Sequence, residues 1–299
     1  AIVGAFFLEV HLIFSVLGGF VTAALSASTS LYPRPFLKWA GGKGRLLSQY
    51  EPFLPQRIDT YYEPFLGGGA VFFHLAGRAR RAVLGDINPE LVNVYCCVRD
   101  QVETLIRHLW DHQRRHSPDY YYDVRQRQSL RSPVERAARL IYLNKTCYNG
   151  LYRENSRGHF NVPMGKYKNP AICDPSLLRA ASAALQIADI QTFSFETLLD
   201  RSLTPRDFVY FDPPYHPISA TSSFTSYSRY GFTGADQERL AQVFRTLANQ
   251  GQRVMLSNSD CDFIRELYRG FTIHPILAAR AINSRAGCRG KIGELLIVS

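Results

Sequence analysis

From residue 33 onward, short apolar runs alternate with longer stretches of mixed apolar and polar residues. Most of the short runs lead into loops rich in glycine, proline, aspartate or asparagine, which is typical of buried strands. The predicted strands are Thr60–Glu63, Ala82–Leu84, Phe208–Phe211, Arg253–Leu256 and Glu294–Val298, and Ala70–Leu75 is a predicted helix. Strands alternating with helices predict an α/β fold with a doubly wound, mostly parallel sheet and a ligand site at the carboxyl ends of its strands.

The first 32 residues have a different pattern. Glu9 is the only charged residue in this segment, and Leu12–Leu25 is almost entirely apolar. Secretory leaders carry basic residues before their apolar run, but none is present here. We therefore expect residues 1–32 to be an upstream apolar extension that is not part of the fold. A real leader or a short membrane anchor is the alternative.

Residues 98–173 have a helical pattern with few acidic side chains and many arginines. These arginines are Arg107, Arg114, Arg115, Arg125, Arg127, Arg131, Arg136 and Arg139. We expect this stretch to form an inserted basic subdomain, which divides the main domain into residues 33–97 and 174–299. An ordinary solvated helical surface is the alternative.

The composition favours a polyanionic partner and a reducing compartment. The 299 residues include 35 Lys and Arg against 25 Asp and Glu, which gives a net charge of +10 at pH 7. Such a balance is common in proteins that bind nucleic acid. The six cysteines include no Cys-x-x-Cys pair, so we expect neither a disulfide framework nor a zinc ribbon, and a cytoplasmic location.

Three histidines recur at helical spacing, at His108, His112 and His116. This spacing would place them on one face of a helix, where three histidines can bind zinc. However, arginines surround them and no fourth ligand is evident from the sequence. We expect a solvated or phosphate-facing helix and no metal site.

A glycine-rich loop, Gly67-Gly68-Gly69, lies between a predicted strand and a predicted helix. Glycines at such a turn tolerate positive φ and let the backbone approach a ligand closely. Asp86 follows at the end of the next strand, where a carboxylate can accept hydrogen bonds from ribose hydroxyls. The pattern indicates a nucleoside-type cofactor, with a plain tight turn as the alternative. Lys43 does not belong to a phosphate-binding P-loop, because Gly44 follows it instead of Ser or Thr.

The segment Asp212-Pro213-Pro214-Tyr215 follows a four-residue apolar strand. Its prolines fix φ and make the turn rigid, so that the Asp212 carboxylate and a proline carbonyl are left as acceptors. Two acceptors directed at one exocyclic amine would orient the nitrogen lone pair toward an electrophile. Tyr215 offers a ring on which a base can stack.

Four segments together resemble the Dam-type (D12 class) DNA adenine-N6 methyltransferases. In chain order they are residues 35–43, 63–69, 86–88 and 212–215. The resemblance extends from about Pro35 to Ser299. It implies a Rossmann-like methyltransferase fold, S-adenosylmethionine as the methyl donor, and residues 98–173 as a mainly helical target-recognition domain for DNA.

The resemblance also implies roles for individual residues. The cofactor-binding positions are Trp39, Lys43, Glu63, Phe65, Gly67, Gly69, Asp86 and Asp212, and the catalytic positions are Asp212, Pro213 and Tyr215. Trp39 can present its aromatic face to the cationic sulfonium side of the donor. Lys43 can meet the donor carboxylate, and Asp86 its ribose. The adenine must leave the DNA stack to reach these residues.

Residues 148–163 are similar to the segment with which the Dam group reads GATC, and Asn149-Gly150 predicts a tight turn there. Arg153 is expected to bond guanine bidentately, with Asn149 and Leu151 beside it. The expected phosphate contacts are Arg157, Lys145, Lys166 and Lys168. A surface hairpin with solvated charges is the alternative.

The predicted function is transfer of a methyl group from S-adenosylmethionine to the N6 amine of a flipped adenine, in GATC. The alternatives are an RNA or protein-amide methyltransferase and a catalytically silent DNA-binding regulator. The expected partner is double-stranded DNA. We expect no metal, no membrane association, a monomer or weak dimer, and a cytoplasmic, nucleoid-associated location.

Overall fold

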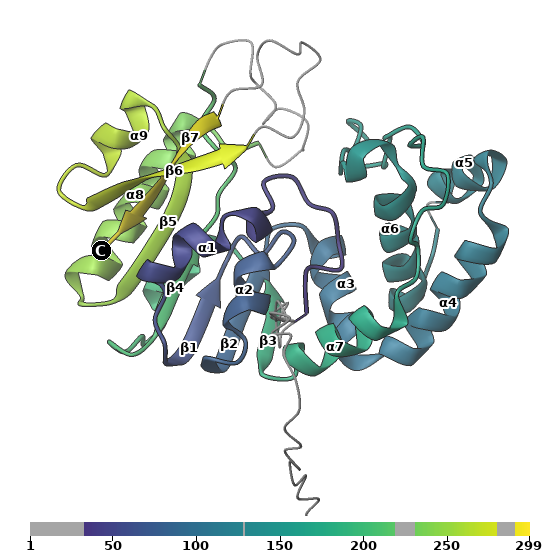
Figure 1. Cartoon of the computed structure of the whole chain (residues 1–299), viewed down its shortest axis with the longest axis horizontal. Coiled ribbons are helices and arrows are strands. Elements are labelled where there is room, and N and C mark those ends of the chain that lie inside the picture. Colours follow the sequence, from purple (N-terminus) through teal and green to yellow (C-terminus); the bar gives the residue numbers. More distant parts are fainter. Residues whose placement is uncertain (1–32, 128, 219–230, 280–290) are drawn as a thin grey trace, which may run out of the picture. The chain divides into compact units, whose positions relative to one another are not determined.

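A seven-stranded sheet with the order β3-β2-β1-β4-β5-β7-β6 forms the centre of the fold (Figure 1). The computed structural model describes residues 33–127, 129–218, 231–279 and 291–299. The strands are β1 Ile58–Glu63, β2 Ala79–Asp86, β3 Ala188–Thr192, β4 Phe208–Phe211, β5 Arg253–Ser259, β6 Thr272–Ala279 and β7 Lys291–Val298. The predicted mostly parallel, doubly wound α/β sheet is confirmed.

The strand order reverses between β1 and β4. Strand β1 pairs in parallel with β2 on one side and with β4 on the other, so the loops after β1 and β4 emerge side by side. Ligands of doubly wound sheets bind at this point of reversal. Strand β7 runs antiparallel to both β5 and β6, and its first residues therefore lie at the same edge as the carboxyl ends of the parallel strands.

Apolar side chains alternate between the two faces of the sheet. In β4, Phe208 and Tyr210 belong to one buried cluster, whereas Val209 and Phe211 belong to the other. A period of two is the geometry of a strand that is buried on both faces. The helices over the two faces are α2 Ala70–Leu75, α3 Pro89–Asp100 and α7 Pro175–Leu185 on the first, and α8 Gly234–Asn249 and α9 Asp262–Leu267 on the second.

Three helices follow α3 and lie beside the main sheet in Figure 1. They are α4 Val102–Arg115, α5 Pro118–Gln126 and α6 Pro133–Thr146. Their buried residues, such as Leu109, Tyr121 and Tyr142, join the same apolar cluster as α2 and α3. The described residues form one compact unit. Within this unit, the assignment of residues 98–173 as an insert stays a proposal. Val98 itself lies in the last turn of α3.

Short helical segments lie before, within and after the proposed insert. These are η1 Lys43–Arg45, α1 Leu47–Tyr50, η2 Glu51–Phe53, η3 Tyr148–Gly150 and η4 Phe195–Asp200. Residues 1–32, the predicted extension, lie outside the described residues. Among the residues that are described, no helix has the length and apolar character needed to cross a membrane.

Candidate active site

The candidate site lies where several strand ends meet. Glu63 ends β1, the loop 64–69 leads from it into α2, and Asp86 ends β2. Asp212 follows β4, and Ser257 lies in β5. Because β7 is antiparallel, Glu294 near its start pairs with Ser259 at the end of β5. The fold therefore brings together most of the predicted cofactor and catalytic positions.

The glycine loop has the backbone conformation that its sequence predicts. Gly67 and Gly69 have φ values of +48° and +67°, which favour glycine. The N–H of Gly67 donates to Oδ2 of Asp86 at 3.2 Å, and the Tyr95 hydroxyl donates to the Gly67 carbonyl at 3.0 Å. Burial raises the pKa of Asp86 to about 6. The loop and the end of β2 are thus joined through a buried carboxyl group.

Lys43 and Asp212 form a buried ion pair. Their Nζ–Oδ1 distance is 2.7 Å, and Lys43 is only 2% exposed. The ammonium also donates to the Gly41 carbonyl at 2.5 Å, and the Ser257 hydroxyl donates to Oδ1 of Asp212 at 3.0 Å. Burial raises the pKa of Asp212, while Lys43 and Ser257 act in the opposite direction. Lys43 therefore favours the carboxylate form at a position where burial opposes it.

Two further carboxyl groups share the electrostatic environment of Lys43. The pKa values of Glu63 and Glu294 are both raised, chiefly by burial, and Lys43 lowers each. Oε2 of Glu63 is buried and, among the described residues, has no hydrogen-bond partner. A buried carboxylate with an unsatisfied oxygen is costly unless a cation or donor compensates it. The site is thus acidic and suited to a cationic ligand.

The Asp212–Tyr215 turn is anchored from three elements. The Tyr215 hydroxyl donates to Oε2 of Glu294 in β7 at 2.7 Å, and the Lys43 ammonium lies 4.8 Å from the centre of the Tyr215 ring. Gln237 of α8 donates to the Pro214 carbonyl at 2.8 Å. Pro213 is buried and Pro214 exposed. These contacts fix the turn beyond what its two prolines impose.

The predicted cofactor residue Phe65 lies in an aromatic cluster. Its ring stacks on Phe195 at a centroid distance of 5.6 Å and meets Phe211 and Phe232 edge-on. Phe65 is only partly buried, so its ring can form part of an apolar wall beside the glycine loop.

Trp39 contacts both the glycine loop and the insert. A Cβ added at Gly67 would lie 2.9 Å from Cδ1 of Trp39, so glycine is needed for this approach. The indole also stacks on Tyr152 at a centroid distance of 5.4 Å and an interplanar angle of 29°. The predicted contact of Trp39 with a sulfonium group stays a prediction.

The segment 148–163 forms the predicted hairpin in irregular form. Glu154 and Phe160 make an isolated antiparallel bridge, and the N–H of Asn161 donates to the Arg153 carbonyl at 3.0 Å. Asn149 and Gly150 both have positive φ, which confirms the predicted turn. Leu151 packs partly against the core, whereas Asn149 and Arg157 are exposed.

Arg153 is held by the opposite side of this hairpin. Its Nε donates to Oδ1 of Asn161 at 2.6 Å, and its Nη2 donates to the Asn161 carbonyl at 3.3 Å. These bonds fix the direction of a guanidinium whose planar fork matches a guanine edge. Its contact with a base stays a prediction.

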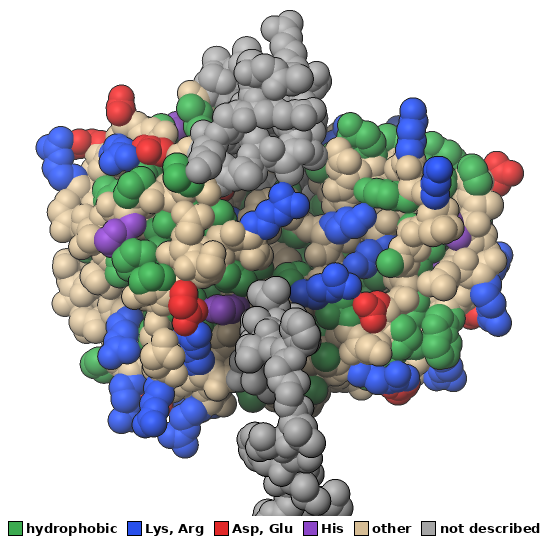
Figure 2. Space-filling model, in the orientation of Figure 1, with side chains coloured by type: hydrophobic (Ala, Val, Ile, Leu, Met, Phe, Trp, Pro, Cys, Tyr) green, Lys and Arg blue, Asp and Glu red, His purple; other side chains and the backbone are tan. Residues whose placement is uncertain are grey.

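Basic side chains occur on both the core and the insert, with several near the middle of the view in Figure 2. The pKa of Lys145 is lowered to about 8, mainly by burial and then by the positive charges of Lys38 and Arg34. These groups lie where the hairpin and the segment before α1 meet, since Asn144 donates to the carbonyls of both Lys38 and Gly150. This cluster of positively charged side chains is suited to an anionic ligand.

Two of the three histidines contact aromatic residues of the insert. His112 stacks on Tyr142 with centroids 4.7 Å apart and bonds the Tyr120 hydroxyl, and His116 bonds the Tyr142 hydroxyl. Both are partly buried against aromatic side chains of the insert, on a helix whose other face is exposed. Burial lowers the pKa of His112 to about 4. Among the described residues, no group of His, Cys, Asp or Glu could hold a metal ion.

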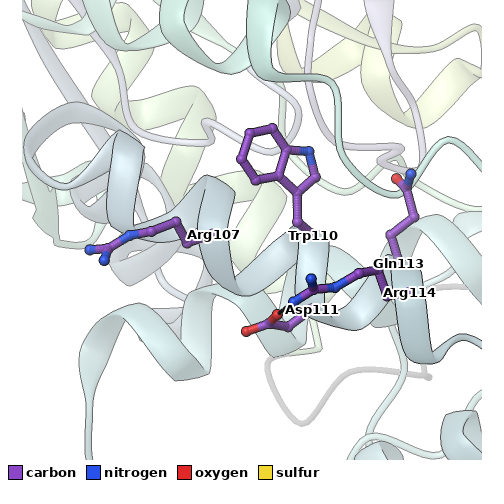
Figure 3. A pocket seen from close by; sticks show the side chains of 5 residues that line it. All are labelled: Arg107, Trp110, Asp111, Gln113 and Arg114. Carbon is purple, nitrogen blue, oxygen red and sulfur yellow. Dashed lines mark hydrogen bonds and ion pairs between the residues drawn. The ribbon is translucent and has the colours of Figure 1, made fainter.

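Figure 3 shows a pocket beside α4, with a volume of about 490 Å³, that none of the predicted cofactor or catalytic residues lines. The described residues that line it all belong to α4, namely Arg107, Trp110, Asp111, Gln113 and Arg114. Arg114 pairs with Asp111 on the same helix, and none of the predicted site residues lines the pocket. It contributes nothing to the candidate site.

Several residues of the site were missed by the sequence analysis. Glu294 and Ser257 lie within strands, and Asn144 and Tyr152 lie in or after α6. Asn144 directly follows the run 140–143 and Glu294 directly precedes the apolar run 295–298, and a polar residue that adjoins such a run is the signal that marks both. Nothing in the local sequence of Tyr152 indicates its contact with Trp39.

Comparison with known proteins gives consistent matches. The model of a family described as D12 class N6 adenine-specific DNA methyltransferase matches residues 39–282. A type II methyltransferase of Lactococcus lactis subsp. cremoris is 45% identical over 273 residues, covering 89% of this chain and 95% of the relative. A type II methyltransferase of Methanocaldococcus jannaschii is 44% identical, covering 89% and 99%. A DNA adenine methylase of Escherichia coli is 37% identical, covering 88% and 94%.

Proposed function

Since the chain belongs to the D12 class of N6 adenine-specific DNA methyltransferases, we propose that it transfers the methyl group of S-adenosylmethionine to the N6 amine of a flipped adenine in GATC. The observation that carries this proposal is the acidic set around Lys43, in which Glu63 is buried and Asp212 and Glu294 are partly buried, beside a glycine loop with positive φ. The set combines a place for a cation with acceptors for an amine.

The donor fits the residues of the site. S-adenosylmethionine supplies an electrophilic methyl group on a positively charged sulfur when it is bound. Gly67 and Gly69 allow the backbone to approach it, and Asp86 is the acceptor for its ribose hydroxyls. Lys43 is the partner of its carboxylate, while Trp39 and Phe65 provide aromatic surface. The unsatisfied Oε2 of Glu63 supports a positively charged ligand here.

The catalytic turn holds the target amine. The Asp212 carboxylate and the Pro213 carbonyl accept hydrogen bonds from the exocyclic amine, so the nitrogen lone pair points away from them. The Tyr215 ring stacks on the flipped base, and its bond to Glu294 fixes the orientation of the ring. As the amine gains positive charge during transfer, the carboxyl groups of the site stabilise it. Positioning and electrostatics supply the acceleration without a covalent intermediate.

The hairpin at residues 148–163 is the proposed reader of the target sequence. Arg153 bonds guanine, with Asn149 and Leu151 beside it, and Arg157 binds phosphate. Residues 33–97 and 174–299 would then carry catalysis, and residues 98–173 would carry recognition. The bonds from Arg153 to Asn161 support this assignment because they preorganise the guanidinium.

The direct test is incubation of the full chain with methyl-labelled S-adenosylmethionine and separate duplex DNA, RNA and protein substrates. We expect label in duplex DNA alone, as N6-methyladenine within GATC. Methylated cytosine, or label transferred to RNA or protein, would overturn the proposal. DNA binding without any transfer would identify a silent DNA-binding regulator instead. N6-methyladenine in another sequence would retain the chemistry and reject GATC.

A further inference from the structure

Tyr152 connects the proposed recognition hairpin with the proposed donor loop. One face of its ring stacks on Trp39, at a centroid distance of 5.4 Å. Trp39 in turn packs against the backbone of Gly67 and Gly68, where an added Cβ would lie 2.9 Å and 3.3 Å from its side chain. A glycine loop, an indole and a tyrosine ring thus form one continuous contact.

Both ends of this contact are fixed to their own elements. The N–H of Gly67 donates a hydrogen bond to Asp86, and its carbonyl accepts one from the Tyr95 hydroxyl. Tyr152 meets Phe160 edge-on with centroids 5.9 Å apart, and its hydroxyl donates to Glu154. A displacement of the hairpin therefore moves the Tyr152 ring, and the contact transmits that displacement to Trp39.

The backbone before Trp39 is held separately. Asn144 accepts from the N–H of Lys38 at 2.9 Å and donates to the Lys38 carbonyl at 2.6 Å. These two hydrogen bonds anchor the backbone of Lys38 to α6. Asn144 also donates to the Gly150 carbonyl of the hairpin, so the hairpin reaches the backbone beside Trp39 through Asn144 and the indole side chain through the Tyr152 ring.

We propose that Tyr152 is a positioning residue that couples docking of the hairpin on DNA to binding of the methyl donor, through Trp39 and the Gly67 loop. The proposal rests on the proposed function and adds a regulatory link between its two ligands. Coupling of this kind is reciprocal, so DNA and donor must each raise the affinity of the other by the same factor.

The sequence offers a clean optical reporter for the test. It contains two tryptophans, Trp39 and Trp110, and Trp110 is 46% exposed on α4, away from the site. Trp110→Phe therefore leaves Trp39 as the sole tryptophan. In this background, dissociation constants for S-adenosylhomocysteine are measured with and without a GATC duplex, and Trp39 emission is followed during titration with the duplex alone.

We expect the duplex to tighten S-adenosylhomocysteine binding by about 5-fold or more, in the usual range of coupling between sites, and to change Trp39 emission. Tyr152→Ala and Tyr152→Leu should both reduce the affinity ratio toward one, while each variant still binds either ligand alone. Tyr152→Phe keeps the ring and should keep the ratio. Tyr122→Ala, at an exposed tyrosine of α5, is the matched control and should leave the ratio unchanged.

An unchanged ratio in Tyr152→Ala and Tyr152→Leu would overturn the proposal, as would a loss in Tyr152→Phe equal to that in Tyr152→Ala. A ratio of one in the Trp110→Phe background would also overturn it, while leaving the proposed function intact if adenine is methylated. Failure of the starting protein to bind S-adenosylhomocysteine would instead count against the proposed function itself.

Discussion

The Lys43 ammonium lies 2.7 Å from Oδ1 of Asp212, which joins η1 to the turn after β4. The same ammonium faces the Tyr215 ring at 4.8 Å, so one buried cation contacts the first and the last side chain of the proposed catalytic turn. The pair has two consequences. It favours the charged form of Asp212 despite burial, and it fixes the side chain that is proposed to hold the target amine.

Replacing Asp212 should separate catalysis from DNA binding. Asp212→Ala removes the proposed acceptor for the amine, so we expect methyl transfer to fall by about 10³-fold or more. Duplex affinity should change little, because the turn is not part of the recognition hairpin. Transfer of labelled methyl groups and a gel-shift titration measure the two quantities. Normal turnover in this variant would reject the proposed role of Asp212.

Removing the positive charge of Lys43 should move the acid limb of the pH profile. Asp212 must be deprotonated to accept from the amine, so activity falls as pH drops through its pKa. Burial raises that pKa and Lys43 lowers it. Lys43→Met should therefore raise it further, and the loss of kcat at saturating donor should begin at a higher pH. Lys43→Arg keeps the charge and serves as the control. An unshifted limb in Lys43→Met would contradict this electrostatic role.

Donor binding should weaken as the pH falls through about 6. This is the value to which burial raises the pKa of Asp86. Below it the carboxyl group is protonated and is a poorer acceptor for the ribose hydroxyls, whereas above it the carboxylate is charged. The titration of Asp86 should extend over roughly one unit of pH on each side of its pKa. Calorimetry of S-adenosylhomocysteine binding between pH 5 and pH 8 therefore measures the effect. In Asp86→Asn the same range should give weaker but nearly pH-independent binding. An identical slope in both proteins would place the titration elsewhere.

Glu294 and Tyr215 should behave as one unit. Tyr215→Phe and Glu294→Gln each disturb the 2.7 Å bond between the two side chains, so we expect each to lower kcat by roughly 10-fold with little effect on the KM for DNA. The double variant should be no worse than either single one, because interacting groups are not additive. Losses that multiply in the double variant would show that the two side chains act independently.

Replacing Arg153 and replacing Arg157 should have different effects on DNA binding. Arg153→Ala removes the proposed guanine contact, and we expect it to reduce discrimination at that base pair by about 1–3 kcal/mol. Arg157→Ala should weaken all duplexes equally and reduce the salt dependence of binding. Competition between GATC duplexes and single-base variants, repeated at two salt concentrations, measures both effects. Equal loss on every sequence for Arg153→Ala would assign Arg153 to the DNA backbone.

Where a predicted strand is a continuous apolar run, its predicted boundaries agree best with those in the structure. Phe208–Phe211 is β4 as predicted, because the run is buried on both faces and Asp212-Pro213 ends it. Ala70–Leu75 is α2 as predicted, and it begins after Gly69 in the left-handed region. Thr233 and Asp236 form a capping box at the start of α8. Such features depend on residues close together in the sequence, so they can be predicted from the local sequence.

Two strands were missed for the opposite reason. β3 contains Asp189 and Gln191 within its five residues, and β6 contains His274 and Pro275. Among the described strands, both are outer strands of the sheet with one unpaired edge, a position where polar residues or proline are tolerated. Their strand conformation comes from pairing with β2 and β7 and not from their own composition.

The sequence by itself determined the alternation of strands and helices, the conformation of the glycine loop, and the rigid turn at Asp212. Each of these depends on residues within a few positions of one another. Only the tertiary structure decided that Lys43 meets Asp212, that Glu294 bonds Tyr215, and that Tyr152 stacks on Trp39. These contacts depend on strand order, on the antiparallel direction of β7 and on the packing of the insert, which local preferences of the chain do not encode.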